Sequence, residues 1–358
     1  MKMKKHNFSA GPCILPESVL EQAADAVREL DGSGLSLIEI SHRSKAFVDV
    51  MEEARQLVKE LLKVPEGYEV LFLQGGASLG FLTAAYNFNI EGKKAAYVNT
   101  GTWSSKAIKE AKLLGEVDVV ASSKDSGFTS IPDWKDSDAC AMHITTNNTI
   151  FGTQYQTLPS RKEGQFLIAD MSSDIFSKEI NVADFDLIYA GAQKNMGPAG
   201  TVMYIVKTAA LGQTGRNIPS YLDLNVHIDK DSMFNTPPVF AVYTSMLTLR
   251  WLKGIGGVSE IEKINNSKAE LLYSEIDRNS LFNGHAEVAS RSKMNATFKL
   301  TDETLADQFN DMWNKAGING LKGHRSVGGY RASMYNALSL ESVEVLVDVM
   351  KELERTQG

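Results

Sequence analysis

The sequence is poor in cysteine and has no long apolar run. Among its 358 residues only Cys13 and Cys140 are cysteines. They are too few for a disulfide framework and are not spaced as zinc ligands, so we expect a reducing compartment and no metal site. The longest uninterrupted apolar runs, at 202–206 and 239–243, have five residues, whereas a membrane-spanning helix needs about 20. Insertion into a membrane is therefore excluded.

An excess of positive charge is also absent. The chain has 37 Lys and Arg against 44 Asp and Glu, a net charge of −7. A nucleic-acid binder needs clustered excess positive charge, so nucleic acid is not expected as a partner. The basic residues Lys2, Lys4 and Lys5 are not followed by the apolar segment of a signal peptide. We therefore expect a cytoplasmic protein.

What the sequence does contain is the pattern of an α/β protein. Helical periodicity alternates with short apolar runs, which is typical of a mainly parallel sheet flanked by helices. A helix that follows Ser44 as its capping residue keeps its apolar positions in phase up to Pro65. Seven strands are expected in one sheet, at residues 70–73, 95–99, 117–121, 140–145, 166–170, 187–190 and 201–206.

Glycines at 254, 256 and 257 interrupt this pattern and predict a domain boundary. We expect a large domain over residues 16–257 and a smaller C-terminal α+β domain over residues 258–358. The N-terminal segment 1–15 is expected to pack near the small domain. Within the small domain, helices are predicted at 258–276, 302–316 and 340–354, and strands at 295–300 and 332–335.

Two predicted strands end at or just before residues that favour a catalytic site. Lys194 lies in a loop of small residues after the strand 187–190, and Asp170 ends the strand 166–170. In an open parallel sheet, ligands bind at the carboxyl ends of the strands. A lysine that forms a Schiff base and an aspartate that keeps a pyridine nitrogen protonated are the minimum that pyridoxal phosphate requires. The alternative is that Lys194 is a solvated loop residue and Asp170 a helix cap.

Two further features favour an anionic, aromatic ligand at this edge of the sheet. Residues 75–78 follow a strand and open a helix, so their backbone N–H groups and the helix dipole suit a phosphate. Their glycine order differs from the Gly-x-Gly-x-x-Gly of dinucleotide folds, which disfavours a dehydrogenase. Trp103 follows the strand 95–99 and offers a flat face for stacking, although a place in the core is the commoner role for a tryptophan.

Basic residues are concentrated in one part of the chain. Residues 312–340 contain no Asp or Glu, although random placement predicts about four. This segment includes the basic residues Lys315, Lys322, His324, Arg325 and Arg331. A shorter basic segment, 41–45, contains His42 and Arg43. In a chain of net negative charge such clusters favour an anionic ligand, and a solvated basic face is the alternative.

The sequence resembles the phosphoserine aminotransferases, pyridoxal-phosphate enzymes of fold type I and aminotransferase class V, over essentially its whole length. Four segments in order carry the resemblance: 40–45, 189–200, 234–238 and 323–333. It implies transfer of an amino group from L-glutamate to 3-phosphohydroxypyruvate, giving O-phospho-L-serine and 2-oxoglutarate in serine biosynthesis. Formation of 4-phosphohydroxy-L-threonine in pyridoxine biosynthesis is a second reaction that the resemblance allows.

The resemblance also implies roles for individual residues. Lys194 matches the Schiff-base lysine, and Asp170 matches the partner of the pyridine nitrogen. Further cofactor contacts are implied for Gly76, Ala77, Trp103, Thr149 and Gln193. Asn235 and Thr236 would reach the cofactor from a second subunit, so a homodimer is expected. 

Substrate contacts are implied in the same way. Arg331 matches the residue that binds the substrate α-carboxylate. The distal phosphate or carboxylate would be bound by His42, Arg43, His324 and Arg325, partly contributed by the partner subunit. Ser78 stands where several relatives have an arginine, so this pocket has one cation fewer than theirs.

Two other classes of function stay open. Another class V enzyme, such as a cysteine desulfurase, would need a nucleophilic cysteine on a mobile loop, and neither Cys13 nor Cys140 is placed for that role. A non-catalytic protein that binds a phosphorylated ligand would keep the basic clusters but would not need the pair of Lys194 and Asp170.

Overall fold

A seven-stranded sheet forms the centre of the molecule. The computed structural model describes residues 4–135, 137–159 and 161–357. The strand order is β2-β10-β9-β8-β5-β3-β4. The strands are β2 (Tyr68–Gln74), β3 (Ala95–Asn99), β4 (Val117–Ser122), β5 (Ala141–Thr145), β8 (Phe166–Asp170), β9 (Leu187–Gly191) and β10 (Thr201–Lys207). All seven predicted strands are present, so the expected α/β fold is confirmed.

Every strand of this sheet except β10 runs in the same direction. Neighbouring strands from β9 to β4 pair in parallel, whereas β10 pairs antiparallel with both β9 and β2. The connection 192–200 between β9 and β10 is too short for a crossover helix, so the chain turns back beside β9. The sheet is mainly parallel, as predicted, and the carboxyl ends of its parallel strands share one edge.

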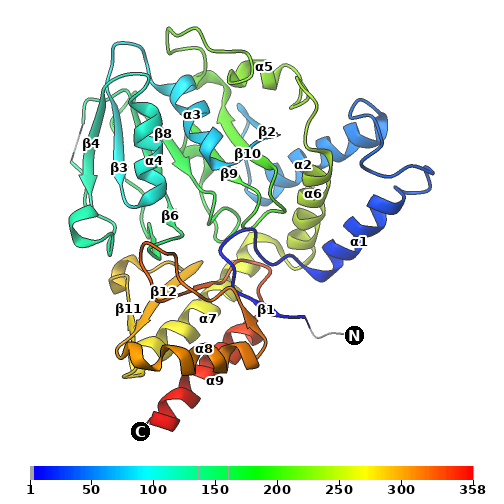
Figure 1. Ribbon diagram of the computed structural model, residues 1–358. Coiled ribbons are helices and arrows are strands. Elements are labelled where there is room, and N and C mark those ends of the chain that lie inside the picture. Colours follow the sequence, from blue (N-terminus) through cyan, green and yellow to red (C-terminus); the bar gives the residue numbers. More distant parts are fainter. Residues whose placement is uncertain (1–3, 136, 160, 358) are drawn as a thin grey trace.

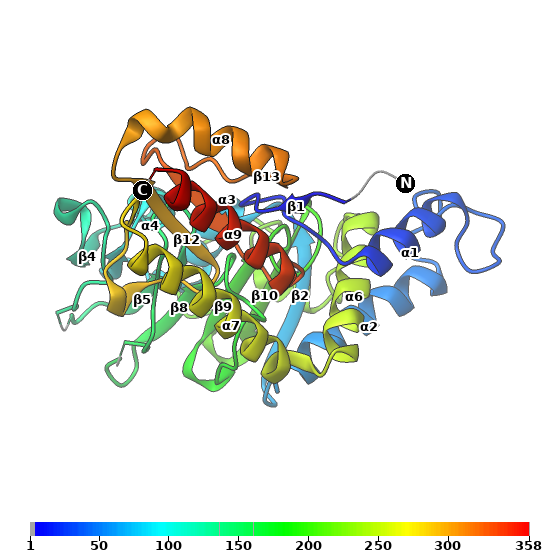
Figure 2. The ribbon, with the colours of Figure 1, turned by 90° about the horizontal axis from the view of Figure 1, so that it is seen from below.

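Helices cover both faces of the sheet (Figures 1 and 2). On one face, α3 (Ala77–Phe88) and α4 (Thr102–Ala111) share a buried cluster with strand residues such as Leu71, Ile168 and Leu187. The other face is covered by α1 (Glu17–Arg28), α2 (Lys45–Leu61) and α6 (Val239–Gly254), whose core includes Val70 and Leu167. The strands are apolar on both sides because both faces are covered. A short helix, α5 (Leu224–Ile228), packs near β2.

α2 begins where predicted, but the expected capping bond is absent. Its apolar positions, among them Phe47, Met51 and Val58, are buried. Ser44 occupies the N-cap position, yet its buried hydroxyl makes no capping hydrogen bond and no other hydrogen bond to a described residue. The Ser44 carbonyl instead accepts the N–H of Val48 at 3.0 Å. The helix start is therefore fixed by backbone bonding and by the apolar face.

After α6 the chain forms a second, smaller core. α7 (Gly257–Arg278) begins at the predicted glycines. A three-stranded antiparallel sheet of β11 (Phe282–Gly284), β12 (Asn295–Leu300) and β14 (Tyr330–Ser333) packs with α8 (Ala306–Lys315) and α9 (Leu340–Gln357). α8 starts later than predicted because Asp302 caps a short 3-10 turn, accepting the N–H of Thr304 at 2.9 Å. β14 is shifted towards the N-terminus of the predicted strand by its pairing with β12.

The N-terminal segment lies against this smaller core. β1 (His6–Asn7) pairs in parallel with β13 (Ile318–Asn319), and Phe8 is buried in the same cluster. A two-stranded hairpin, β6 (Asn147–Asn148) and β7 (Thr153–Gln154), lies beyond β5.

The division into domains at residues 257 and 258 stays a prediction, and residues 1–3 and 358 of that division lie outside the described residues. No described helix is long and apolar enough to cross a membrane.

Candidate active site

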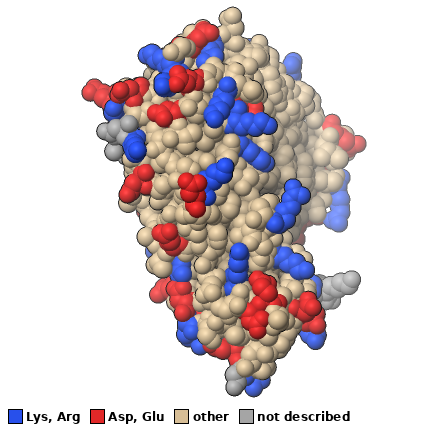
Figure 3. Space-filling model, turned by 60° about the vertical axis from the view of Figure 1, so that its left-hand side comes forward, with Lys and Arg blue, Asp and Glu red and all other residues tan. Residues whose placement is uncertain are grey.

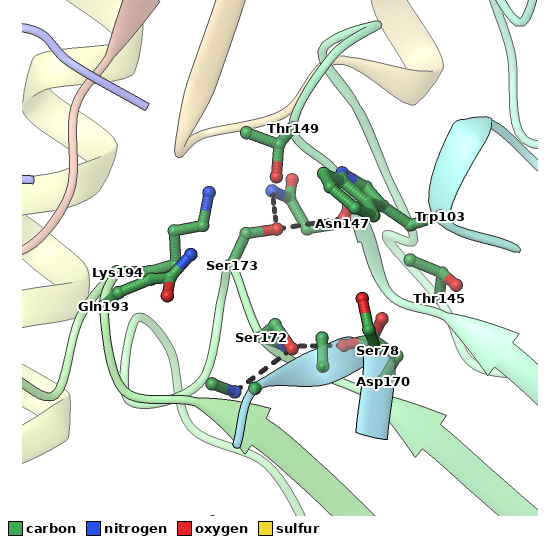
Figure 4. A pocket seen from close by; sticks show the side chains of 13 residues that line it. Ser78, Trp103, Thr145, Asn147, Thr149, Asp170, Ser172, Ser173, Gln193 and Lys194 are labelled. Atoms are coloured by element: carbon green, nitrogen blue, oxygen red, sulfur yellow. Dashed lines mark hydrogen bonds between the residues drawn. The ribbon is translucent and has the colours of Figure 1, made fainter. Parts of the chain in front are cut away.

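A cavity of about 290 Å³ lies at the edge of the sheet where the parallel strands end (Figure 4). Thr145, Asp170 and Gly191 line it from the carboxyl ends of the adjacent strands β5, β8 and β9. Its lining consists of Gly76, Ala77, Ser78, Trp103, Thr145, Asn147, Thr149, Asp170, Ser172, Ser173, Gly191, Gln193 and Lys194. Ligands of parallel α/β sheets generally bind at this edge.

Lys194 contacts the N-terminal segment of the chain. It lies in the loop between β9 and β10, and its Nζ donates a hydrogen bond to the Ala10 carbonyl. The same carbonyl accepts the Tyr335 hydroxyl at 2.9 Å, and Nζ lies 5.6 Å from the centroid of the Tyr335 ring. A Cβ atom on Gly11, which has φ +143°, would lie 2.8 Å from Lys194 Nζ. Glycine at this position therefore leaves room for the amine.

Asp170 is a buried carboxylate at the end of β8. The residue is 3% exposed, and its Oδ1 accepts the N–H of Ser172 at 2.9 Å. Burial raises the pKa of the Asp170 carboxyl to about 6, although hydrogen bonds from Ser172 oppose this shift. A cation placed beside the carboxylate would favour its ionised form and offset the cost of burial.

The first turn of α3 forms another wall of the cavity. Gly76 is its N-cap, and Ala77 and Ser78 begin the helix, where the N–H groups have no intrahelical acceptor. A Cβ atom on Gly76 would meet no atom within 4 Å, so the backbone here faces open space. Backbone donors and the positive end of the helix dipole together suit an anion such as a phosphate.

An aromatic ring and several polar groups complete the cavity. In Figure 4, Trp103, which lies in the first turn of α4, faces Lys194 and Gln193 across the open space. Asn147 Nδ2 donates to Ser173 Oγ at 2.8 Å, and the Ser173 hydroxyl donates to the Asn147 carbonyl at 3.0 Å. The Thr145 hydroxyl is buried and has no hydrogen-bond partner in the described part of the chain. An aromatic face and an unpaired hydroxyl thus meet in one cavity.

The cavity brings together seven of the residues predicted to bind the cofactor: Gly76, Ala77, Trp103, Thr149, Asp170, Gln193 and Lys194. Asn235 and Thr236 do not line it. They lie next to Gln74, which precedes the glycines of the α3 turn: Asn235 Nδ2 donates to Gln74 Oε1 at 3.3 Å, and Gln74 Nε2 donates to the Thr236 carbonyl at 2.8 Å. Their contact with a cofactor in a second subunit stays a prediction.

The residues predicted to bind substrate lie outside the lining. Arg331 is at the rim, where its Nη1 donates to the Thr149 carbonyl at 3.4 Å and its buried Nε has no hydrogen-bond partner among the described residues. His324 and Arg325 lie in the loop 323–329 before β14, and His42 and Arg43 in the turn before α2. Arg331 thus touches a lining residue, and the roles of all five stay predictions.

Sequence reasoning missed several residues of the site. Thr145, Asn147, Ser172 and Ser173 line the cavity, and each ends or follows a predicted strand, which is the signal that could have found them. Cys13 carried no such signal. Its thiol donates to the Lys194 carbonyl, and burial raises the pKa of the thiol to about 12. A thiol that stays neutral is poorly suited to nucleophilic attack.

Comparison with known proteins agrees with this geometry. The family model described as aminotransferase class-V matches residues 5–346. The chain therefore belongs to the class V aminotransferases and is an aminotransferase rather than a dehydrogenase. Curated relatives named phosphoserine aminotransferase, from Flavobacterium psychrophilum and Parabacteroides distasonis, are 62% and 54% identical to it over 98% and 99% of this chain and 99% of each relative.

Solved structures point to the same group of enzymes. The phosphoserine aminotransferase from Bacillus circulans subsp. alkalophilus is 42% identical, with a TM-score of 0.95 over 99% of both chains. A phosphoserine aminotransferase with bound pyridoxal phosphate, from Trichomonas vaginalis, is 35% identical, with a TM-score of 0.90 over 97% of this chain and 100% of that chain. The chain is thus similar to phosphoserine aminotransferases over its whole length.

Proposed function

We propose that this aminotransferase uses pyridoxal phosphate to transfer the amino group between L-glutamate and 3-phosphohydroxypyruvate, giving O-phospho-L-serine and 2-oxoglutarate. The observation that carries the proposal is the meeting of Lys194, Asp170 and the first turn of α3 in one cavity. The amine would bind the aldehyde of that cofactor, and the buried carboxylate would pair with its pyridine nitrogen. The anion site would bind its phosphate. The relatives named phosphoserine aminotransferase support the choice of substrates.

The residues present fit this cofactor. The buried Asp170 carboxylate gains a favourable partner if the adjacent pyridine nitrogen carries a proton. The N–H groups of Gly76 and Ala77 would bind the phosphate, with Gln193 beside them, and Trp103 would stack on the ring. The hydroxyl of Thr149 would bind the phenolic oxygen. When bound, the cofactor supplies an electron sink for the substrate α-carbon.

Lys194 is proposed to move the proton. Its free Nζ would act as general base and then general acid at the substrate α-carbon. The Ala10 carbonyl and the Tyr335 ring hold this amine over the cavity, so it stays within reach of a bound substrate. The amino donor and the acceptor would use the same site in turn, so we expect ping-pong kinetics.

Arg331 is proposed to bind the α-carboxylate that both substrates share. Its Nη1 reaches the Thr149 carbonyl at the rim, and its buried Nε has no partner within the part of the chain that the structure describes. A guanidinium with an unpaired N–H is suited to bind a carboxylate through two parallel hydrogen bonds. His324 and Arg325 on the neighbouring loop would bind the distal phosphate or carboxylate.

A homodimer with shared sites is part of the proposal. Tyr221 and Phe234 are 38% and 41% exposed and pack edge-on against the same ring, that of His227, and exposed aromatic side chains that lie together favour a protein interface. Phe234 precedes Asn235 and Thr236 in the chain. A second subunit on this surface would cover the apolar side chains and would bring these two residues towards its own cavity.

A visible absorbance spectrum tests the proposed function. The purified protein is reconstituted with pyridoxal phosphate and measured before and after L-glutamate, then after 3-phosphohydroxypyruvate. We expect the visible band to bleach with glutamate and to return with the phosphorylated keto acid. Return with a different keto acid alone would overturn the substrate assignment, and a protein without any visible band would be the non-catalytic phosphate binder.

Lys194→Ala is the matching variant. It should fold normally by circular dichroism and should lack the visible band and all turnover, because it lacks the amine that captures the cofactor aldehyde. Wild-type turnover by this variant would disprove the role of Lys194. A cysteine desulfurase is disfavoured by the raised pKa of the Cys13 thiol, which keeps this thiol neutral.

A further inference from the structure

The cavity offers few positive charges to a substrate with two anionic groups. Of the described residues that line it, Lys194 is the one cation, and Ser78 at the α3 turn is uncharged. The proposed acceptor carries a phosphate in addition to its α-carboxylate. The cations that bind this phosphate must therefore lie at the rim of the cavity.

Lys106 lies at this rim, on α4, one turn after Trp103. Its Nζ is 4.5 Å from the centroid of the Trp103 ring, and Trp103 lines the cavity. The side chain is exposed and, within the described chain, is held by this contact with the indole face and by no ion pair. A cation over an indole is weakly stabilised at an exposed site. The indole thus holds the ammonium beside a residue that lines the cavity, and among the described residues no carboxylate forms an ion pair with it.

Two other cations, Arg325 and Arg331, and the side chain of His324 approach the rim from the C-terminal part of the chain. Arg331 reaches the Thr149 carbonyl. The pKa of His324 is lowered by burial and further by the positive charges of Arg331, Arg325 and Lys106, so α4 and the loop 323–329 face one another. On the face shown in Figure 3, Lys and Arg side chains run through the middle, and many Asp and Glu lie nearer its edges. Facing cations disfavour one another unless an anion binds between them.

His324 has a donor directed away from its own loop. Its Nδ1 accepts the N–H of Ser326 at 3.2 Å and lies 2.7 Å from the Ser326 hydroxyl. A neutral histidine whose Nδ1 is an acceptor carries its proton on Nε2. The Nε2–H group is therefore a donor for an anion, in addition to the charges of Arg325 and Lys106.

We propose that Lys106 is a specificity-determining residue, whose ammonium binds the distal phosphate of the acceptor from the α4 side, opposite His324 and Arg325. The inference rests on the proposed function. A point charge attracts a phosphate dianion more strongly than the single charge of the glutamate γ-carboxylate. Lys106 therefore favours phosphorylated acceptors over unphosphorylated ones, which a merely solvated lysine would not do.

Steady-state kinetics of Lys106→Met test this inference, because the variant loses the charge and keeps an unbranched side chain. We expect the KM for 3-phosphohydroxypyruvate to rise about tenfold, the KM for glutamate to rise less than about threefold, and kcat to stay unchanged. Inhibition by inorganic phosphate, competitive with the acceptor, should weaken by a similar factor. Lys106→Arg should retain most of the wild-type affinity.

Lys109→Met is the matched control, because Lys109 is exposed on the same helix, one turn further from the cavity. Lys109→Met should leave kcat and the KM values for 3-phosphohydroxypyruvate and glutamate at the wild-type values. A KM for the acceptor that is the same in Lys106→Met and wild type, or that rises equally in both variants, would overturn the role of Lys106. If the wild-type enzyme itself does not convert 3-phosphohydroxypyruvate, the proposed function fails and the inference fails with it.

Discussion

Asp170 is buried in the wall of the cavity, where an ionised carboxylate is costly. Burial raises its pKa from 3.8 to about 6, so in the cofactor-free protein the ionised form costs roughly 3 kcal/mol relative to the unfolded chain. Because the folded pKa is the higher one, the cost is fully present above about pH 6. It disappears as the pH falls below 3.8, where the carboxyl is protonated in both states.

Asp170→Asn should therefore stabilise the cofactor-free protein near neutral pH, by up to about 3 kcal/mol, while abolishing transamination. Asparagine retains an oxygen for the Ser172 N–H and carries no charge. Urea unfolding at neutral pH and at about pH 4 measures the effect, and the gain in stability should shrink at the lower pH.

Asp138→Asn is the control for this prediction. Asp138 is exposed, and Lys162 lowers the pKa of its carboxyl, so its replacement should change stability little and in the opposite direction. A variant of Asp170 that is no more stable than wild type at neutral pH would show that burial of this carboxylate is not the cost inferred here.

At the scale of elements, α7 fixes the segment that follows β14. Lys268 on α7 is fully buried, and its Nζ donates to the carbonyls of Met334, Tyr335 and Leu338 at 3.0, 3.0 and 3.1 Å. This segment carries the Tyr335 side chain, which contacts Ala10 and lies beside Lys194. One helix side chain thus holds the backbone beside the reactive amine.

Lys268→Met should lower the free energy of unfolding, because three buried carbonyls lose their donor. Removal of an amine whose pKa is lowered to about 7 by burial offsets part of this loss, so we expect a net loss of about 2 kcal/mol. Lys263→Met on the same helix removes an exposed ion pair with Glu260 and should change the free energy of unfolding little. Urea unfolding of both variants under identical conditions makes the comparison. Similar losses in the two variants would contradict the role assigned to Lys268.

The strands and their ends could be predicted because strands buried on both faces are continuous apolar runs. Asp170 and Lys194 follow two of these runs, so their meeting at one edge could also be predicted. The contact of Lys194 with the Ala10 carbonyl could not be predicted from the sequence. It depends on a backbone group, and the N-terminal segment is held by pairing of β1 with β13, about 300 residues away in sequence. The hydrogen bond between Asn147 and Ser173 could not be predicted either, because uncharged polar side chains of this kind occur in many loops.

At the scale of the whole molecule, a single chain does not gather all the predicted residues in its cavity. Lys194 and Asp170 line it, whereas Arg43 lies in the turn before α2 and Asn235 lies beside Gln74. In the proposed homodimer, each cavity would take Lys194 from its own chain and Arg43 from the partner. This arrangement makes a prediction about mixed dimers.

Mixing of two impaired variants, Lys194→Ala and Arg43→Ala, should restore activity after subunit exchange. In a mixed dimer, one site receives the intact Lys194 of one chain and the intact Arg43 of the other, whereas the second site lacks both. With random pairing, half of the dimers are mixed and each has one intact site of two, so the expected activity is about a quarter of wild type. The recovered activity is measured as turnover at low concentrations of the phosphorylated acceptor, because loss of Arg43 weakens binding of the phosphate and so lowers turnover most under these conditions.

The combination of Lys194→Ala with Asp170→Asn provides the control, since both residues line the cavity of one chain. Every site in that mixture lacks one of the two, so no activity should return. If Arg43 served the cavity of its own chain, the mixture with Arg43→Ala would stay as impaired as its components, because no pairing would then produce an intact site. Recovery in the first mixture and not in the second therefore requires that Arg43 acts across the subunit interface, whereas Lys194 and Asp170 act within one chain.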